Sequence, residues 1–423
     1  MKKLEVSLAV LAATFGLVAP AVAQDGDNFN RDRNVSVRDR PKPEYDAAGI
    51  RMGGFRLYPE LLVAGEYNDN IFATDGANVE EDFIWHITPS ARLASQWSTH
   101  ELNFSLAVPA LIYSDFSDNN TTDVSVGVDG RLDVYRDFYF HGGASYSDRT
   151  EPLSSSPTSL PLAEPIEYTE AAANVGFVKA FNRLRISGEA RMATADFEDG
   201  VFFNLTPAEQ DDRDRTVVNY GLRADYAVSP LTAFFVAVGA NTRDYDLDPP
   251  VTIVNRDSEG YEALVGANFD LTRLIRGEIG VGYLSQTYDD PTVDETSGLA
   301  VRANVEWFPD ELVTVSFGAS REVADAGAFG ASSYVANNAS FAIDYEWRRN
   351  VVLGFNVGYS FDEYEGIDRE DSRLATEFSA DYLVDRGTAI FAQLGHYEQE
   401  SDGLQFGRDY DINRVVVGIR LRR

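Results

Sequence analysis

Beyond its first fifty residues, the chain alternates between apolar and polar positions with a period of two. In residues 353–361 the odd positions are Leu, Phe, Val, Tyr and Phe, and the even positions between them are Gly, Asn, Gly and Ser. Residues 102–108, 124–129 and 299–307 follow a similar alternation. Because successive side chains of a β-strand point to opposite faces, each run predicts a strand with one apolar and one polar face.

These runs are long, often about a dozen residues, whereas strands of globular proteins usually have about five or six. A tilted strand that crosses a bilayer needs roughly nine to eleven residues. Strand length therefore favours a membrane barrel. A soluble sandwich remains the alternative fold, and it predicts recovery from the soluble periplasm and a gel mobility that heating leaves unchanged.

The connections between the runs fall into two classes, which is typical of an outer-membrane barrel. Very short turns are predicted at 97–99, 135–137, 181–183, 229–230, 272–273, 308–310, 348–350 and 385–387. Longer polar segments are predicted at 148–167, 197–214, 246–257 and 398–408. Two strands for each short turn, with one more at each terminus, predict an all-β transmembrane antiparallel barrel of about 16–18 strands. Short periplasmic turns and long extracellular loops follow from this arrangement.

Aromatic residues also divide between the two ends, as expected for the belts at the two membrane–water interfaces. The belt near the short turns is predicted to contain Trp97, Phe138, Phe181, Trp307, Tyr345 and Trp347. The belt near the long loops is predicted to contain Tyr67, Phe72, Tyr113, Tyr146, Tyr283, Tyr359 and Tyr397.

The first residues are typical of a secretory signal, because two lysines precede an apolar stretch and Ala21-Val22-Ala23 forms a cleavage site. We therefore expect a signal peptide over residues 1–23, a disordered periplasmic leader over 24–53 and the barrel over 54–423. A small plug in the lumen is the alternative for the leader. No apolar run long enough for a transmembrane helix follows Ala23. The expected location is the cell outer membrane.

Composition excludes further classes. The net charge is -32, with no basic stripe, so we expect no nucleic-acid partner. Cysteine is absent, so no disulfide framework is available. Lysine occurs only at positions 2, 3, 42 and 179, and nearly all positive charge is arginine, which can pair with several carboxylates at once.

Charged residues recur on the polar face of the predicted strands. A charge facing lipid at mid-depth costs roughly 2–4 kcal/mol, so these side chains are expected to point into the lumen. The candidate lumen-facing charges are Arg92, Arg131, Arg185, Arg191, Arg223, Arg302, Arg373, Glu60, Asp129, Glu189, Asp225, Glu278, Glu306 and Glu377. They form either a field that selects permeants or a structural ion-pair lattice without selectivity, and the sequence does not choose between these.

Two loops are candidates for a constriction. Residues 148–167 are rich in Pro and Ser and contain three leucines, and residues 197–214 contain Val201-Phe202-Phe203. Packing between neighbouring loops is the alternative. The loops are also acidic, for example at Asp211, Asp212 and Asp214, which indicates either divalent cations bridging to lipopolysaccharide or simply solvated loops.

No catalytic, cofactor-binding or metal-ligating motif is present, so we expect neither an enzyme nor a cofactor. The four histidines are scattered at 86, 100, 141 and 396. The sequence contains no nucleophile elbow, zinc-protease motif or phosphate-binding loop.

The start of the predicted barrel resembles a known family. The segment from Tyr58 to Phe72 (YPELLVAGEYNDNIF), followed by Asp82-Phe83-Ile84, Pro89, Trp97, His100-Glu101-Leu102 and residues 113–123, is similar to the outer-membrane β-barrel porins found beside exopolysaccharide and capsule operons. The match covers about the first quarter of the mature chain. It implies a barrel that secretes polysaccharide or acts as a porin, and no catalytic residues. Such barrels commonly end in an aromatic residue, whereas this chain ends in Arg423.

The sequence thus leaves three main functions open. The first is a channel passing hydrophilic cargo, with exopolysaccharide export as its specific form. The others are a general diffusion porin for small solutes and a non-conducting structural or adhesion barrel. A membrane-embedded hydrolase, whose site would assemble only in space, is a fourth alternative that no sequence motif supports. The expected partners are outer-membrane lipid and lipopolysaccharide, the barrel assembly machinery and, for the export function, polysaccharide and a periplasmic export complex.

Overall fold

The computed structural model describes residue 29 and residues 34–76, 79–155, 162–202, 205–247, 255–272, 274–326, 331–405 and 407–423. The predicted signal peptide over 1–23 lies outside the described residues.

Long strands account for nearly all of the secondary structure that is described. The strands are β1 Ile50–Met52, β2 Phe55–Asn68, β3 Asp82–Ser95, β4 Glu101–Ala107, β5 Ala110–Tyr113, β6 Thr121–Thr122, β7 Val124–Tyr135, β8 Phe138–Glu151, β9 Leu162–Glu164, β10 Ile166–Phe181, β11 Leu184–Phe197, β12 Gly200–Phe202, β13 Pro207–Ala208, β14 Arg215–Ser229, β15 Thr232–Tyr245, β16 Ser258–Leu271, β17 Ile275–Tyr288, β18 Thr296–Asp310, β19 Val313–Asp325, β20 Ser333–Arg348, β21 Val351–Glu365, β22 Glu370–Leu383, β23 Thr388–Asp402 and β24 Tyr410–Arg422. Short 3-10 turns are η2 Ser117–Asn119, η3 Leu153–Ser155 and η4 Asp211–Arg213. Among the described residues, no helix has the length and apolar character needed to cross a bilayer.

The strands form a closed antiparallel barrel of 18 strands, as the sequence predicts. Closure is made by β2, which pairs with β3 on one side and with β24 on the other. The strand of the barrel that follows β3 is divided into β4 and β5 at Pro109, because proline has no N–H to donate to the neighbouring strand. Closure leaves no free sheet edge, which a chain in contact with lipid requires.

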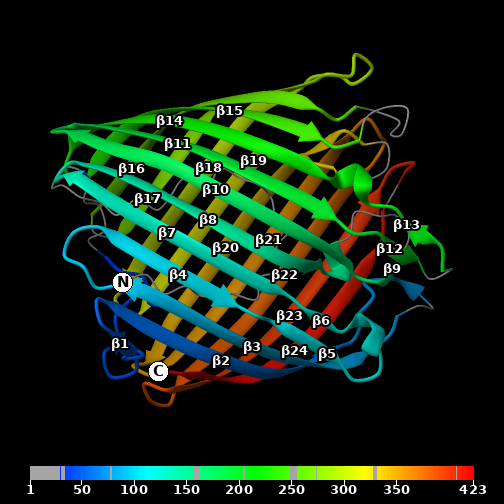
Figure 1. Cartoon of the computed structure of the whole chain (residues 1–423), viewed down its shortest axis with the longest axis horizontal. Coiled ribbons are helices and arrows are strands. Elements are labelled where there is room, and N and C mark those ends of the chain that lie inside the picture. The colour runs from blue at the N-terminus through cyan, green and yellow to red at the C-terminus, as the bar shows by residue number, and fades with distance from the viewer. Residues whose placement is uncertain are drawn as a thin grey trace.

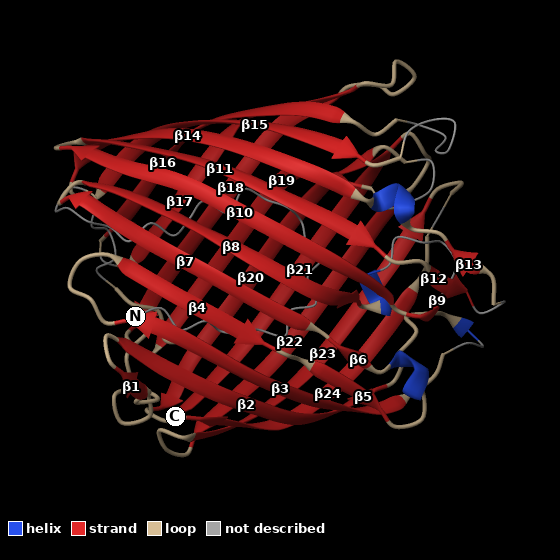
Figure 2. Ribbon diagram, viewed as in Figure 1, coloured by secondary structure: helices blue, strands red, loops and turns tan. Residues whose placement is uncertain are grey.

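The two ends of the barrel differ, as Figures 1 and 2 show. Short turns, β1 and the C terminus lie at one end, and the 3-10 turns and the small sheet β9–β12–β13 lie at the other. The predicted turns fall between paired strands, with one boundary displaced. Strand β18 continues through Pro309 to Asp310, because a register shift between Trp307 and Asp310 accommodates the proline.

Side chains on the outer face are apolar and largely exposed, whereas those on the inner face are mixed and more buried. In β14, Leu222 on the outer face is 51% exposed, whereas Asp225 on the inner face is 0% exposed. Small buried clusters lie at separate places on the described wall in place of one continuous core. An outer surface covered by large apolar side chains is unsuited to water and suits hydrocarbon.

The predicted aromatic belts need one correction. Trp97, Phe181, Trp307, Trp347 and Tyr345 are exposed near the short turns, and Tyr67, Tyr146, Tyr283 and Tyr359 are exposed near the long loops. The assignment of Phe72, Tyr113 and Tyr397 to the outer belt is wrong. Phe72 and Tyr113 pack in a cluster with loop residues, and the ring of Tyr397 lies 4.5 Å from the guanidinium of Arg414 on the inner face.

The leader also differs from the expectation of disorder over residues 24–53. Residues 34–46, which we call the strap, contact the inner wall near the short turns, and Val37 within it is fully buried. After the strap, β1 forms a hairpin with the start of β2. The sequence pattern shows the charges of this segment but not their partners, which lie some 270 to 340 residues further along the chain.

Candidate functional site

The candidate site is the inner wall of the barrel. The strand register places the fourteen charged residues predicted for the lumen on the inner face, together with small and amide side chains. A barrel of this size leaves an aqueous channel that side chains cannot fill.

Four of the predicted charges lie together on strands β11, β14 and β17. The guanidinium of Arg223 pairs with Asp225 at 2.8 Å and with Glu278 at 2.6 Å, and its face lies 3.9 Å from the ring centroid of Phe235. Arg185 pairs with the same aspartate at 3.3 Å. A bidentate arginine between two carboxylates is a strong and geometrically fixed contact.

Most of the other predicted charges pair with residues outside the predicted set. The ion pairs are Arg302–Glu262 at 3.4 Å, Arg191–Glu170 at 3.9 Å, Glu60–Arg420 at 3.5 Å, Glu377–Arg414 at 3.5 Å, Arg131–Asp133 at 2.7 Å, Arg373–Asp362 and Glu306–Arg276. Several of these ion pairs join strands that are not consecutive in the sequence. Which residues pair therefore depends on the register of the strands. The alternation of the sequence gives the face of a strand but not its register.

The remaining three predicted residues contact neutral side chains. The guanidinium of Arg92 lies 4.6 Å from the ring centroid of Tyr58. Asp129 accepts a hydrogen bond from Asn103 at 2.8 Å, and Glu189 accepts one from Asn174 at 3.3 Å. The described inner wall thus carries both signs of charge, and most of the predicted charges lie in ion pairs.

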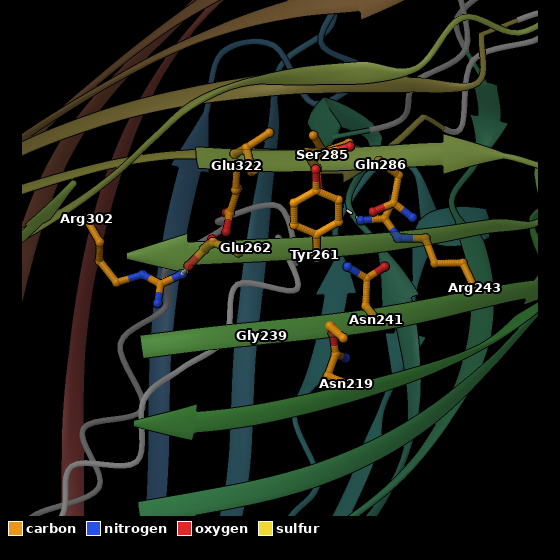
Figure 3. Close-up of a pocket in the computed structure, with 13 residues that line it drawn as sticks. Asn219, Gly239, Asn241, Arg243, Tyr261, Glu262, Ser285, Gln286, Arg302 and Glu322 are labelled. Atoms are coloured by element: carbon orange, nitrogen blue, oxygen red, sulfur yellow. Dashed lines mark hydrogen bonds and ion pairs between the residues drawn. The ribbon is translucent and has the colours of Figure 1, made fainter. Parts of the chain in front are cut away.

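A hollow on the inner face of β14–β19 has a cavity volume of about 60 Å³ (Figure 3). Its lining includes Asn219, Asn241, Arg243, Glu262, Arg302 and Glu322. A β-carbon added at Gly260 would lie 2.0 Å from the side-chain oxygen of Gln286, so this glycine lets the amide lie flat on the wall. The hollow offers amide groups beside one arginine–glutamate pair. Of the lining residues, only Arg302 was predicted from sequence, since single amides on a polar face carry no distinctive signal.

At the long-loop end, the two loops predicted as constriction candidates pack against each other. Their segments β9, β12 and β13 form a three-stranded sheet. Leu153, Leu162 and Phe202 from these loops pack with Ile84 and Phe197 of the wall. These loops therefore contact both each other and the wall strands β3 and β11.

Three loop arginines join loops that are distant in sequence. Arg213 pairs with Glu151 at 2.9 Å, and Arg256 donates to the carbonyl of Ala326 at 2.9 Å. Arg408 donates to the carbonyl of Leu153 at 2.6 Å. Charge-assisted hydrogen bonds of buried arginines to distant backbone carbonyls fix the loops relative to one another.

One loop carboxyl group is set to titrate near neutrality. Burial, together with the negative charges of Asp196, Asp211 and Asp246, raises the pKa of Asp214 to about 6, against the lowering effect of a hydrogen bond from the Phe197 N–H at 2.6 Å. A raised pKa means that the folded loop favours the protonated form. The contribution of Asp214 to the stability of the folded loop is therefore present at acidic pH and is lost as the pH rises through about 6.

We therefore expect the loop around Asp214 to be better ordered at pH 5 than at pH 7.5. Hydrogen exchange of the Phe197 amide measures this directly, and Asp214→Asn should remove most of the difference. Equal protection of that amide in the wild-type chain at both pH values would contradict the assignment.

Acidic residues of the described loops take part in ion pairs and hydrogen bonds. Within the part of the chain that is described, no group of three or more His, Asp or Glu side chains is arranged to hold a metal ion. In the acidic segment after β21, Asp371 is buried and pairs with Arg369 at 2.6 Å. This carboxylate therefore belongs to an ion pair at the outer end of the wall.

A closed barrel with an apolar outer face, a charged inner wall and loops at one end is an outer-membrane β-barrel. The chain belongs to the family described as Putative beta-barrel porin 2, whose sequence model matches residues 42–423. No curated protein matches the chain.

Several solved structures align with most of this chain at low sequence identity. The FrpB iron transporter from Neisseria meningitidis (F3-3 variant) is 9% identical with a TM-score of 0.46, covering 86% of this chain and 81% of its own. OpdK from Pseudomonas aeruginosa is 11% identical with a TM-score of 0.44, covering 87% and 99% respectively. The siderophore receptor PiuA from Acinetobacter baumannii is 8% identical with a TM-score of 0.46, covering 89% and 82%.

Proposed function

We propose that this protein is a channel that passes hydrophilic cargo across the outer membrane. The observation that carries the proposal is the inner wall, where arginines and carboxylates pair across the lumen face while apolar side chains cover the outside. Water must fill the space between such walls, because desolvating so many charges without water would be costly. The loops at the outer end are joined to one another by ion pairs and hydrogen bonds, which favours a selective channel over an open diffusion porin.

As the specific cargo we propose a polysaccharide that is exported to the cell surface. The hollow on β14–β19 supports this proposal, since its amides and its Arg302–Glu262 pair can donate to and accept from the hydroxyl groups of a sugar. Because the arginine lies beside a carboxylate, the hollow suits a polymer without a dense charge of one sign. The resemblance to porins beside exopolysaccharide operons points in the same direction.

The channel proposal is tested by conductance in planar bilayers. The purified, refolded barrel is expected to give discrete current steps, and heat-modified gel mobility shows that the added protein is folded. Absence of steps from folded protein would exclude a channel and leave the structural or adhesion function.

Export is tested separately from conductance. Deletion of the chain in its native host should lower the amount of secreted polysaccharide, and the wild-type gene should restore it. Complementation with Asn241→Ala/Gln286→Ala should restore less polymer than the wild-type gene, at equal amounts of barrel in the membrane. Unchanged secretion after deletion would leave a porin for small solutes as the function.

A further inference from the structure

The strap, residues 34–46, lies on the inner wall at the short-turn end. Contacts at its start, middle and end show its course along the wall. The carbonyl of Asn34 accepts from Arg276 at 2.7 Å on β17, and the N–H of Val37 donates to the hydroxyl of Thr314 at 3.0 Å on β19. The carbonyl of Tyr45 accepts from Arg422 at 3.1 Å on β24. The strap therefore extends along the arc from β17 to β24 before the chain enters the barrel.

Arg38 fixes the middle of the strap to three strands. Its guanidinium pairs with Asp344 of β20 at 2.5 Å and with Asp381 of β22 at 3.2 Å. Between these strands it lies over Gly354 of β21, where an added β-carbon would come within 2.4 Å of the guanidinium. A larger residue at this position of β21 would displace the arginine, so the absence of a side chain at Gly354 leaves the space that the guanidinium occupies.

A second group of contacts involves Glu346 of β20, which is buried. Arg40 and Lys42 lie 3.5 Å and 3.8 Å from its carboxylate. The positive charges of the strap thus face the wall and meet the carboxylates of β20 and β22 there.

Two of the three acidic residues of the strap accept hydrogen bonds from the strap itself. Asp39 accepts from the hydroxyl of Ser36 at 2.9 Å, and Asp46 accepts from the N–H of Lys42 at 2.8 Å, both within the strap itself. The side chain of Glu44 is largely exposed and lies 3.9 Å from Arg349 in the turn after β20. The strap has as many acidic as basic residues, and its three basic groups all pair with carboxylates of the wall.

Upstream of the strap, Phe29 provides an apolar anchor. Its ring is buried against Ala227 and Ala233 beside a short turn and lies 4.9 Å from the guanidinium of Arg185. Because this contact is to β11, β14 and β15, it lies beyond the β17 end of the strap. The chain is thus held at both ends and in the middle.

We propose that the strap is the element that sets the width and charge of the periplasmic opening. While bound, it occupies space along more than a third of the wall and pairs with Asp344, Glu346 and Asp381. Glu346 and Asp381 also lie 3.8 Å from Arg349 and 3.9 Å from Arg420, so Asp344 depends most on the strap for its cation. When it is released, the opening widens and these three carboxylates face the permeation path, so cations are favoured. The proposal rests on the channel function of the barrel.

The test compares the wild-type chain with a variant lacking residues 34–46 and with R38Q/R40Q/K42Q, which keeps the length of the strap. Both variants should give larger current steps and admit larger poly(ethylene glycol) chains than the wild type. The triple variant should also shift the reversal potential in a KCl gradient toward cation selectivity. The matched control is K179Q, which removes a cation that pairs with Asp137 near a short turn, away from the strap.

A cross-link tests the closed state without removing the strap. The chain contains no native cysteine, so R38C/D344C carries the only two thiols. A bifunctional maleimide joining them should lower the conductance of this variant to the wild-type value, and the unlinked variant should conduct more. If the deletion and triple variants fold, conduct and keep the wild-type conductance and reversal potential, the strap proposal is overturned while the channel remains. If no variant conducts, the channel function fails as well.

Discussion

Leu222→Arg is expected to lower the free energy of unfolding by about 2–4 kcal/mol, because it places a charge in hydrocarbon near mid-depth. Leu222 lies at the centre of β14 on the outer face and is 51% exposed in the absence of lipid. The size of the effect depends on the bilayer and should shrink toward either interface. Urea titration of the barrel refolded in lipid vesicles, followed by tryptophan fluorescence, measures the change.

Gly221→Arg is the matched control for this substitution. Gly221 is the preceding residue, faces the lumen, and has no atom within 4 Å of an added β-carbon. It lies opposite Glu189 in the register, so the new arginine has a carboxylate within reach. The expected change is within about 1 kcal/mol. Equal losses for the two variants would mean that both faces of β14 meet the same medium.

Arg223→Gln is expected to cost about 2 to 3 kcal/mol, because it leaves Glu278 without its cation and Asp225 with only Arg185. The value is below that for a pair buried in a dry core, since water in the lumen screens part of the charge. Single-channel measurements should also show increased cation selectivity, as two negative groups lose a positive partner.

The second substitution Glu278→Gln should recover part of this loss, because it removes the uncompensated carboxylate. Arg191→Gln provides the comparison for a weak pair, as Arg191 lies 3.9 Å from Glu170 with a side chain that is 38% exposed. Its expected cost is less than about 1 kcal/mol. A cost for Arg223→Gln no larger than for Arg191→Gln would show that the Arg223 cluster is not a structural centre of the wall.

The architecture of the wall was predictable from sequence because two local signals agree. The alternation gives the face of each residue, and the spacing of short turns gives the number of strands. The position of the Phe308-Pro309-Asp310 turn was displaced because a register shift carries β18 past the proline, and no periodic pattern encodes such a shift. Local signals therefore fix the elements better than their boundaries.

The contacts within the lumen were less predictable, for a different physical reason. The alternation indicates that Arg302 faces inward, but its partner Glu262 is on β16, two strands away from β18. The strap is the clearest example, because Arg38 lies in a polar segment typical of disorder, and its partners Asp344 and Asp381 lie 306 and 343 residues further along the chain. Contacts between residues so far apart leave no mark in a local window of sequence.

The two faces of the wall are distinguished by the accessibility of spin labels placed singly along them, in a chain that has no native cysteine. Labels at Phe104, Val305 and Val357 should collide with oxygen dissolved in lipid, and labels at Arg302 and Asn356 should collide with a water-soluble nickel reagent. The reverse pattern, or equal access of the nickel reagent to both sets, would contradict a lipid-facing outer wall around a water-filled lumen.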